Sequence, residues 1–207
     1  MTIYSYKIIR DYGFAPNPFY GICTLATCKP DIRKSATLGD WVLGFGSAAK
    51  GSELREKLVF AMLVDDKITF DEYWVGPDYQ CKKPVIGGSL KQKYGDNIYH
   101  RSNGKWKQAD SHHSLENGEE NKHNLVRDTK SDAVLLSTHF WYFGKDAVAV
   151  PGNLRCLIPC CRKYIKPDVP ENQLKEWLEN LNAVGGGGFI GEPAKFSKGF
   201  ERYDGNS

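Results

Sequence analysis

The polar segment from Tyr94 to Ser114, YGDNIYHRSNGKWKQADSHHS, crowds titratable and aromatic side chains into one short run. Within it, Asp96 can act as a general base, and Asn97 offers a hydrogen-bond donor and an acceptor that suit the edge of a heterocycle. His112 and His113 follow a predicted strand. Because adjacent side chains of an extended chain point in different directions, we expect at most one of the two to face a site.

Three kinds of role are open for these groups. His112 can serve as the acid–base residue of an enzyme if Asp96 or Asp128 contacts it, because a carboxylate partner fixes the imidazole tautomer. The same three side chains can instead bind a divalent metal, since imidazole and carboxylates are ligands of several such ions. They can also form hydrogen bonds to a ligand or a structural network. No signature such as H-E-x-x-H decides among these roles, so the cofactor is unknown.

Other segments carry groups that suit a flat ring or a phosphate. The loop DYGFAPNPFYG has two prolines that restrict its conformations, and it combines aromatic faces with carboxylate and amide groups; it can also be held by its own aromatic packing. Gly44 and Gly46 leave room on one strand face for a ligand or another backbone, and Ser47 follows them. Arg127 can bind a phosphate or form a surface ion pair. The predicted ligand-binding residues are Asp11, Tyr12, Phe14, Asn17, Phe19, Ser47, Asn97, His113 and Arg127.

The composition indicates an ordinary globular protein. The 207 residues are 41% hydrophobic and 26% charged, and the net charge of +3 permits a nucleic-acid partner without requiring one. The six cysteines have irregular spacing and no C-x-x-C motif, so we expect small buried hydrophobic residues rather than a zinc site. No apolar run approaches the length of a membrane helix, and the N-terminus does not resemble a signal peptide. We therefore expect a cytoplasmic protein that does not bind membranes.

Turn residues and hydrophobic patterns predict the elements that position the candidate groups. The Asn103-Gly104 pair favours a tight turn between two short strands. Thr69, with Glu72 three residues later, indicates the capped start of a short helix. The apolar stretch AVLLSTHFWYFG, residues 133–144, predicts one long strand. Further strands are predicted within residues 2–10, 22–28, 41–45 and 57–66.

The stretches GDWVLGFGS and KLVFAMLVDDKITFDEYW are similar to the core of the PUA-like superfamily, notably its EVE, ASCH and YTH branches. The resemblance implies an α+β fold, a PUA-like mixed β-barrel with flanking helices. We expect a single domain over residues 1–207, with the PUA-like core at about 1–165. A C-terminal helix at about 168–183, with an apolar stripe at helical spacing, is expected to pack on that core.

A second resemblance spans most of the chain. In this order, DYGFAPNPF, CTLATCKP, GDWVLGFGS, YGDNIYHR, DSHHS and NLVRDT resemble the nucleotide modification associated domain family, type two. Its members are associated with hypermodification of DNA bases in bacteria and phages. The resemblance implies a nucleotide or modified base as the partner, either free or within DNA, and it implies no reaction mechanism or oligomeric state.

Two functions follow from these observations. The first is binding of a modified nucleobase or nucleotide in a pocket of the PUA-like barrel, with aromatic residues of the proline-containing loop against the ring. The alternative is an enzyme that acts on a base or nucleotide, with His112 and either Asp96 or Asp128 as acid–base or metal-binding groups. A protein-interaction module is a third interpretation, because a fold alone does not determine function.

Overall fold

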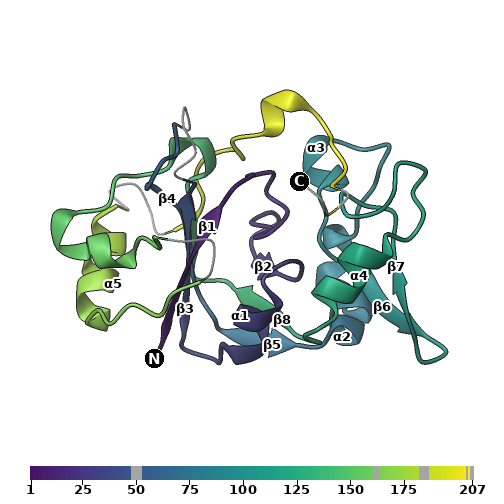
Figure 1. The fold of residues 1–207 in the computed structure, drawn as a ribbon, viewed down its shortest axis with the longest axis horizontal. Helices are drawn as coiled ribbons and strands as arrows, with labels where there is room; N and C mark the ends of the chain where they lie inside the picture. Colours follow the sequence, from purple (N-terminus) through teal and green to yellow (C-terminus); the bar gives the residue numbers. More distant parts are fainter. Residues whose placement is uncertain (48–52, 161–163, 182–186, 204, 206–207) are drawn as a thin grey trace.

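The computed structural model describes residues 1–207 apart from 48–52, 161–163, 182–186, 204 and 206–207 (Figure 1). Its largest sheet has five strands, in which the first pair and the last pair of neighbours are parallel and the others antiparallel. In spatial order they are β1 (Ile3–Ile8), β3 (Trp41–Gly46), β4 (Leu58–Leu63), β9 (Phe140–Tyr142) and β10 (Gly188–Phe189).

A smaller sheet and a hairpin complete the strands. The antiparallel second sheet has the order β2 (Cys23–Leu25), β8 (Val134–Ser137) and β5 (Asp66–Ile68), and the hairpin consists of β6 (Tyr99–Ser102) and β7 (Lys105–Gln108). The α-helices are α1 (Pro30–Ser35), α2 (Phe70–Val75), α3 (Leu90–Lys93), α4 (Lys122–Asp128) and α5 (Glu171–Asn180). The predicted α+β class is confirmed. Over the described residues, however, the strands form three separate sheets rather than a closed barrel.

Local sequence signals account for several elements. The hairpin turn places Asn103 and Gly104 at φ of 50° and 72°, a left-handed conformation that asparagine and glycine adopt at low cost. The N-terminus of α2 has the predicted capping box. The hydroxyl of Thr69 accepts the Glu72 N–H at 3.2 Å, and the Glu72 carboxylate accepts the Thr69 N–H at 2.7 Å.

The prediction of one long strand over residues 133–144 is wrong. The chain forms β8 and β9 instead, and these strands belong to different sheets. Between them the backbone N–H and the hydroxyl of Thr138 both donate to the carboxylate of Asp65, at 2.6 and 2.7 Å. The hydroxyl of Ser137 also donates to the carbonyl oxygen of His139. These hydrogen bonds turn the chain and let it cross from one sheet to the next.

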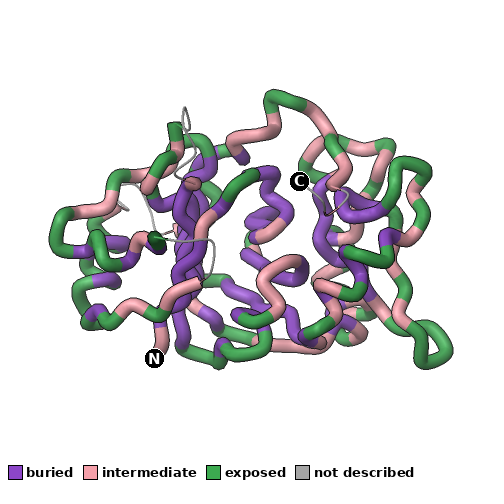
Figure 2. Tube along the Cα trace, viewed as in Figure 1, coloured by how far each residue is buried: buried purple, intermediate pink, exposed green. Residues whose placement is uncertain are grey.

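Strand β3 lies at the centre of the core, buried along its whole length (Figure 2). On one face Trp41, Leu43 and Phe45 join the apolar cluster that contains Leu174 and Trp177 of α5. This helix begins at Glu171 rather than at the expected residue 168, and the expected end at residue 183 lies outside the described residues. None of the described helices combines the length and the apolar character that a membrane span requires.

The space beside the glycines of β3 is occupied. A Cβ on Gly44 would lie 2.2 Å from the ring of Phe60, and one on Gly46 would lie 1.8 Å from the carbonyl oxygen of Leu54. The glycines therefore permit close packing of a side chain and a neighbouring backbone. The cavity that the sequence suggested beside this strand is not found among these residues.

Lys82 anchors the proline-containing loop from inside the protein. Its buried ammonium donates to the carbonyl oxygen of Asn17 at 3.0 Å, to the Asn17 side-chain oxygen at 2.8 Å and to the carbonyl oxygen of Ile22 at 2.6 Å. Burial lowers the pKa of Lys82 to about 8. The nearby carboxylate of Asp96 accepts hydrogen bonds from Thr24 and Tyr73, and burial raises its pKa to about 6. This polar network fixes the loop that leads to the candidate site.

Replacing Lys82 by methionine should therefore destabilise the fold. Methionine keeps an apolar chain of similar length but leaves three buried acceptor groups without their donor. We expect the free energy of unfolding to fall by about 3 kcal/mol, measured by urea denaturation at pH 7. The control is Lys105→Met, because Lys105 is exposed on β7. Equal stability of the two variants would contradict an anchoring role for Lys82.

Candidate functional site

Five segments that are distant in the sequence meet around a cavity of about 290 Å³. They are the end of β1 with the loop that follows it, the residues before α1, the histidine pair, the end of α4 and the C-terminal segment. The residues that line the cavity include six of the predicted ligand-binding or catalytic residues: Asp11, Tyr12, Phe14, His112, His113 and Arg127. The cavity also contains Cys28, Lys29 and Tyr203, which sequence reasoning did not select.

At one side of this cavity Cys28, His113 and Asp128 form a chain of contacts. The Nδ1 atom of His113 lies 3.0 Å from Oδ2 of Asp128, and the opposite ring nitrogen, Nε2, lies 3.9 Å from Sγ of Cys28. Because the carboxylate accepts the proton on Nδ1, Nε2 is left to exchange a proton with the sulfur. A cysteine, a histidine and a carboxylate in contact in this order are the arrangement that activates a cysteine nucleophile. We call Cys28, His113 and Asp128 the triad.

Asp128 is completely buried, and polar contacts satisfy both of its oxygens. Oδ2 also accepts a hydrogen bond from the Tyr99 hydroxyl at 3.0 Å. Oδ1 accepts from the backbone N–H of Cys28 at 3.1 Å and from Nε of Arg127 at 3.0 Å. Burial alone would raise the pKa of Asp128, but the positive charges of His113 and Arg127 hold it well below its usual range. The carboxylate therefore stays ionised and holds its partners in place.

The charge on His113 follows from the same contacts. Burial alone would lower the pKa of His113, but Cys28 and Asp128 outweigh this effect and raise it to about 9. Near neutral pH a protonated imidazole therefore faces the sulfur of Cys28. This is the arrangement in which a histidine takes up the proton of a cysteine nucleophile.

The backbone at Cys28 is held in an unusual conformation. Cys28 and Lys29 have φ values of 57° and 40°. These values lie in the left-handed region of backbone conformation, which residues other than glycine and asparagine rarely adopt. The buried guanidinium of Arg33 fixes this turn by donating to the carbonyl oxygen of Cys28 at 2.8 Å. One terminal nitrogen of Arg127 lies 4.0 Å from the sulfur. The strained turn thus presents the thiol to the cavity beside a guanidinium group.

His112 lies next to the triad in a different environment. Its ring packs against Tyr12, Phe14 and Tyr94 with centroid distances of 4.9, 4.9 and 5.2 Å. Its Nδ1 donates to the carbonyl oxygen of Glu201 at 2.5 Å. Burial, reinforced by His113, lowers the pKa of His112 to about 3, so the ring is neutral at pH 7. In the described contacts it is the neighbouring His113 that bonds to Asp128; a catalytic role for His112 stays a prediction.

The other predicted site residues lie elsewhere. They line neither this cavity nor a second cavity of about 580 Å³ that adjoins it. Asp96, Asn97 and Asn17 are fully buried. Asp96 belongs to the network described above, while the Asn97 amide donates to the carbonyl oxygens of Tyr73 and Tyr79. The remaining two are Phe19, which packs against Phe189 and Phe196, and Ser47, whose backbone N–H donates to Ile8.

One possible metal-ligand atom from each of Cys28, His113 and Asp128 lies within 4.8 Å of the other two, close enough for all three to contact one ion. The local contacts fit a metal poorly. An ion bound to either oxygen of Asp128 would compete with the hydrogen bonds which that oxygen already accepts. It would also lie beside the positive charge of Arg127, which opposes a divalent cation. The geometry therefore favours a hydrogen-bonded chain of the three side chains over a metal site.

A family model described as nucleotide modification associated domain 2 matches residues 1–200 of the chain. The match includes all three residues of the triad, and it confirms the resemblance to this family that the sequence motifs indicated. No curated protein and no solved structure matches the chain. The resemblance to PUA-like cores therefore stays a prediction.

The neutral state of His112 predicts a pH dependence of stability. The unfolded chain takes up a proton on this residue near its usual pKa of about 6.5, whereas the folded protein does so only near 3. The contribution of His112 is thus present above pH 6.5 and is lost as the pH falls. Between pH 7 and 5 the wild type should lose about 2 kcal/mol more than His112→Asn, which keeps a donor near the Glu201 carbonyl.

Urea unfolding at both pH values measures this difference, and His123→Asn is the control because His123 is exposed on α4. If His112→Asn and the wild type lose the same stability on acidification, His112 is not held neutral in the folded protein.

Proposed function

Because the chain belongs to the nucleotide modification associated domain 2 family, we propose that it is an enzyme acting on a nucleotide or modified base through a cysteine nucleophile. The observation that carries this proposal is the chain of contacts from Cys28 through His113 to Asp128. No other group of three histidine, cysteine, aspartate or glutamate side chains gathers so closely in the described part of the chain.

The contacts assign a role to each residue. The imidazolium of His113 holds the proton next to the Cys28 sulfur, and the sulfur attacks an electrophilic carbon of the bound nucleotide or of a substituent on its base. The leaving group departs with the proton that His113 gives it. A second nucleophile, water or an amine, then displaces the Cys28 sulfur from the carbon and passes its own proton to His113. Asp128 orients His113, and Arg127 stabilises negative charge that develops next to the sulfur.

The walls of the cavity fit the flat ring of a nucleobase. Tyr6, Tyr12, Phe14 and Tyr203 offer aromatic surface, while Arg10 and Lys29 supply positive charge. Such a mixture of aromatic faces with a few polar groups is typical of sites for small heterocyclic ligands. The same surface supports the second candidate function, in which the cavity binds a modified base without any turnover.

Four further features of the protein are predicted by its sequence. They are a PUA-like core, a single domain over residues 1–207, a cytoplasmic location and a base presented within DNA. The acid–base assignment of His112 is also untested, although this residue lines the cavity next to the triad. The proposal places Cys28 and His113 at the reacting atoms instead.

The reactivity of Cys28 towards iodoacetamide tests the triad directly. At pH 7 we expect Cys28 to be alkylated at least tenfold faster than the exposed Cys81 and Cys156 of the same protein, measured by peptide mass spectrometry. His113→Asn and Asp128→Asn should remove most of this difference, because the proton acceptor is lost or misoriented. The difference should also shrink as the pH approaches 9, because ordinary thiols ionise in that range.

If Cys28 reacts no faster than the two exposed cysteines, or if His113→Asn leaves its rate unchanged, the triad assignment is wrong. A second measurement separates the two candidate functions. Nucleotides and modified nucleotides are incubated with the wild type, with Cys28→Ser and with the control Cys81→Ser. Product or a covalent adduct that only Cys28→Ser abolishes supports the enzyme, whereas ligands that raise the melting temperature without product support a binding protein.

A further inference from the structure

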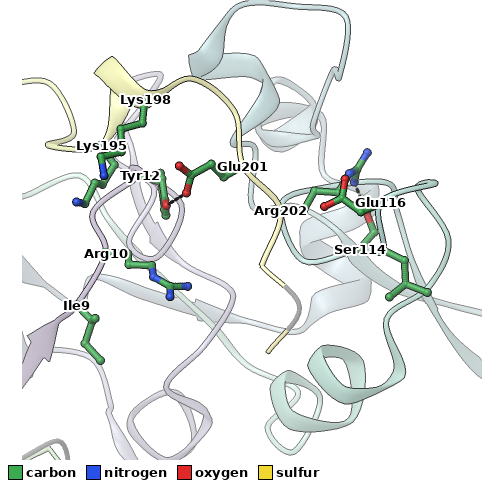
Figure 3. Close-up of a pocket in the computed structure, with 10 residues that line it drawn as sticks. Ile9, Arg10, Tyr12, Ser114, Glu116, Lys195, Lys198, Glu201 and Arg202 are labelled. Carbon is green, nitrogen blue, oxygen red and sulfur yellow. Dashed lines mark hydrogen bonds between the residues drawn. The ribbon is translucent and has the colours of Figure 1, made fainter. Parts of the chain in front are cut away.

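A second, larger cavity of about 580 Å³ adjoins the one that contains the triad. The residues Ile9, Arg10 and Tyr12 line both, so the two cavities share a wall. The larger one is formed by the end of β1, by the residues that follow the histidine pair, and by the C-terminal segment (Figure 3). Figure 1 shows this segment, in yellow, crossing from the five-stranded sheet to the side of the hairpin.

The lining of the larger cavity is rich in cations. It contains Arg10, Lys195, Lys198 and Arg202 together with the acidic Glu116 and Glu201. Arg202 is engaged with Asp110 at 2.5 Å and with Ser114, and the Glu201 carboxylate accepts a hydrogen bond from Tyr12. The contact with Asp110 offsets the charge of Arg202, and Glu201 adds a carboxylate to the lining.

Three of the cations have no ion-pair partner. Among the described residues, no carboxylate forms an ion pair with Arg10, Lys195 or Lys198. In Figure 3 these three lie on the side of the cavity where Tyr12 and its partner Glu201 are drawn, while Glu116 is drawn beside Arg202 on the other side. A hollow with unpaired guanidinium and ammonium groups attracts an anion with several oxygens, such as a phosphate.

The lysines are held in position by the residues that shape the smaller cavity. The backbone N–H of Lys195 donates to the carbonyl oxygen of Asp11 at 2.9 Å, and that of Ala194 donates to the Asp11 carboxylate at 3.0 Å. A short distance along the chain, the Tyr94 hydroxyl donates to the carbonyl oxygen of Gly199 at 3.0 Å. The segment that carries Lys195 and Lys198 is therefore fixed against the loop that precedes the triad.

We propose that the larger cavity is the phosphate subsite of this enzyme, so that its substrate is a nucleoside phosphate rather than a nucleoside or a free base. The base occupies the aromatic cavity beside Cys28, and the phosphate oxygens lie against Arg10, Lys195 and Lys198. The placement of the base rests on the proposed function. A nucleotide carries a flat ring and a polyanion in one molecule, as the two adjoining cavities require.

The phosphate can belong to a free nucleotide or to the backbone of a DNA strand, and both present the same chemistry to Arg10 and the two lysines. Binding is measured by calorimetry on the full chain with Cys28→Ser, which prevents turnover. The probes are thymidine and deoxycytidine, their 5′-mono- and 5′-triphosphates, and a single-stranded tetrathymidylate. The phosphorylated probes should bind at least tenfold more tightly than the nucleosides, and their affinity should fall as the salt concentration rises.

The double substitution Lys195→Gln/Lys198→Gln should weaken binding of the phosphorylated probes at least tenfold and leave nucleoside binding unchanged. Lys195→Arg/Lys198→Arg should retain the affinity because it keeps both charges. The matched control is Lys105→Gln/Lys107→Gln, which removes two exposed charges from β7 and should not affect mononucleotide binding. Stronger binding of the triphosphate than of the tetrathymidylate identifies a free nucleotide as the source, and the reverse identifies a DNA strand.

Equal affinities for nucleosides and their phosphates would overturn the phosphate subsite, as would an absence of binding by every probe or an equal loss in the control. The binding test of the phosphate subsite is independent of the alkylation test of the triad, because alkylation of Cys28 does not depend on Lys195 or Lys198. Slow alkylation with strong phosphate binding would reject the nucleophile and keep the subsite. Fast alkylation without preference for phosphate would do the opposite.

Discussion

The buried carboxylate of Asp128 holds together the parts of the chain that form the candidate site. A charge without exposure to water is stable only when other groups satisfy it, and here Tyr99, Arg127, His113 and the backbone of Cys28 do so. Each of these partners comes from a different element or turn, apart from the adjacent Arg127. The one anion therefore fixes the position of the thiol, the tautomer of the imidazole and the direction of the guanidinium.

Short-range sequence signals predicted much of the fold. The Asn103-Gly104 turn and the Thr69 capping box each depend on residues no more than three positions apart. The local sequence therefore contains all the groups that form them. The break between β8 and β9 depends instead on Asp65, which lies more than seventy residues before Thr138. An apolar stretch with two polar residues in the middle gives no sign that a distant carboxylate turns the chain there.

The site was predictable only in part for the same reason. The histidine pair, Arg127 and Asp128 stood out by residue type, but the sequence does not show which carboxylate a histidine contacts, and the structure pairs His113 with Asp128. Asp96 was predicted as an acid–base or metal-binding residue because it lies in a polar segment of the sequence. In the structure it is buried, and its carboxylate accepts hydrogen bonds from Thr24 and Tyr73. Cys28 resembled an ordinary buried cysteine. The available signal was that the stretches CTLATCKP, DSHHS and NLVRDT each supply one member of the triad.

The C-terminal segment has a consequence for how the protein matures. Tyr203 lines the cavity of the triad, its backbone N–H donates to the carbonyl oxygen of His112, and its carbonyl oxygen accepts from the Asn124 amide. The cavity therefore has no complete wall until residue 203 has been synthesised and has docked. A growing chain on the ribosome can already have its central sheet and its cysteine while lacking the enclosure around them. Such a chain presents a cavity that lacks the wall which Tyr203 supplies in the finished protein.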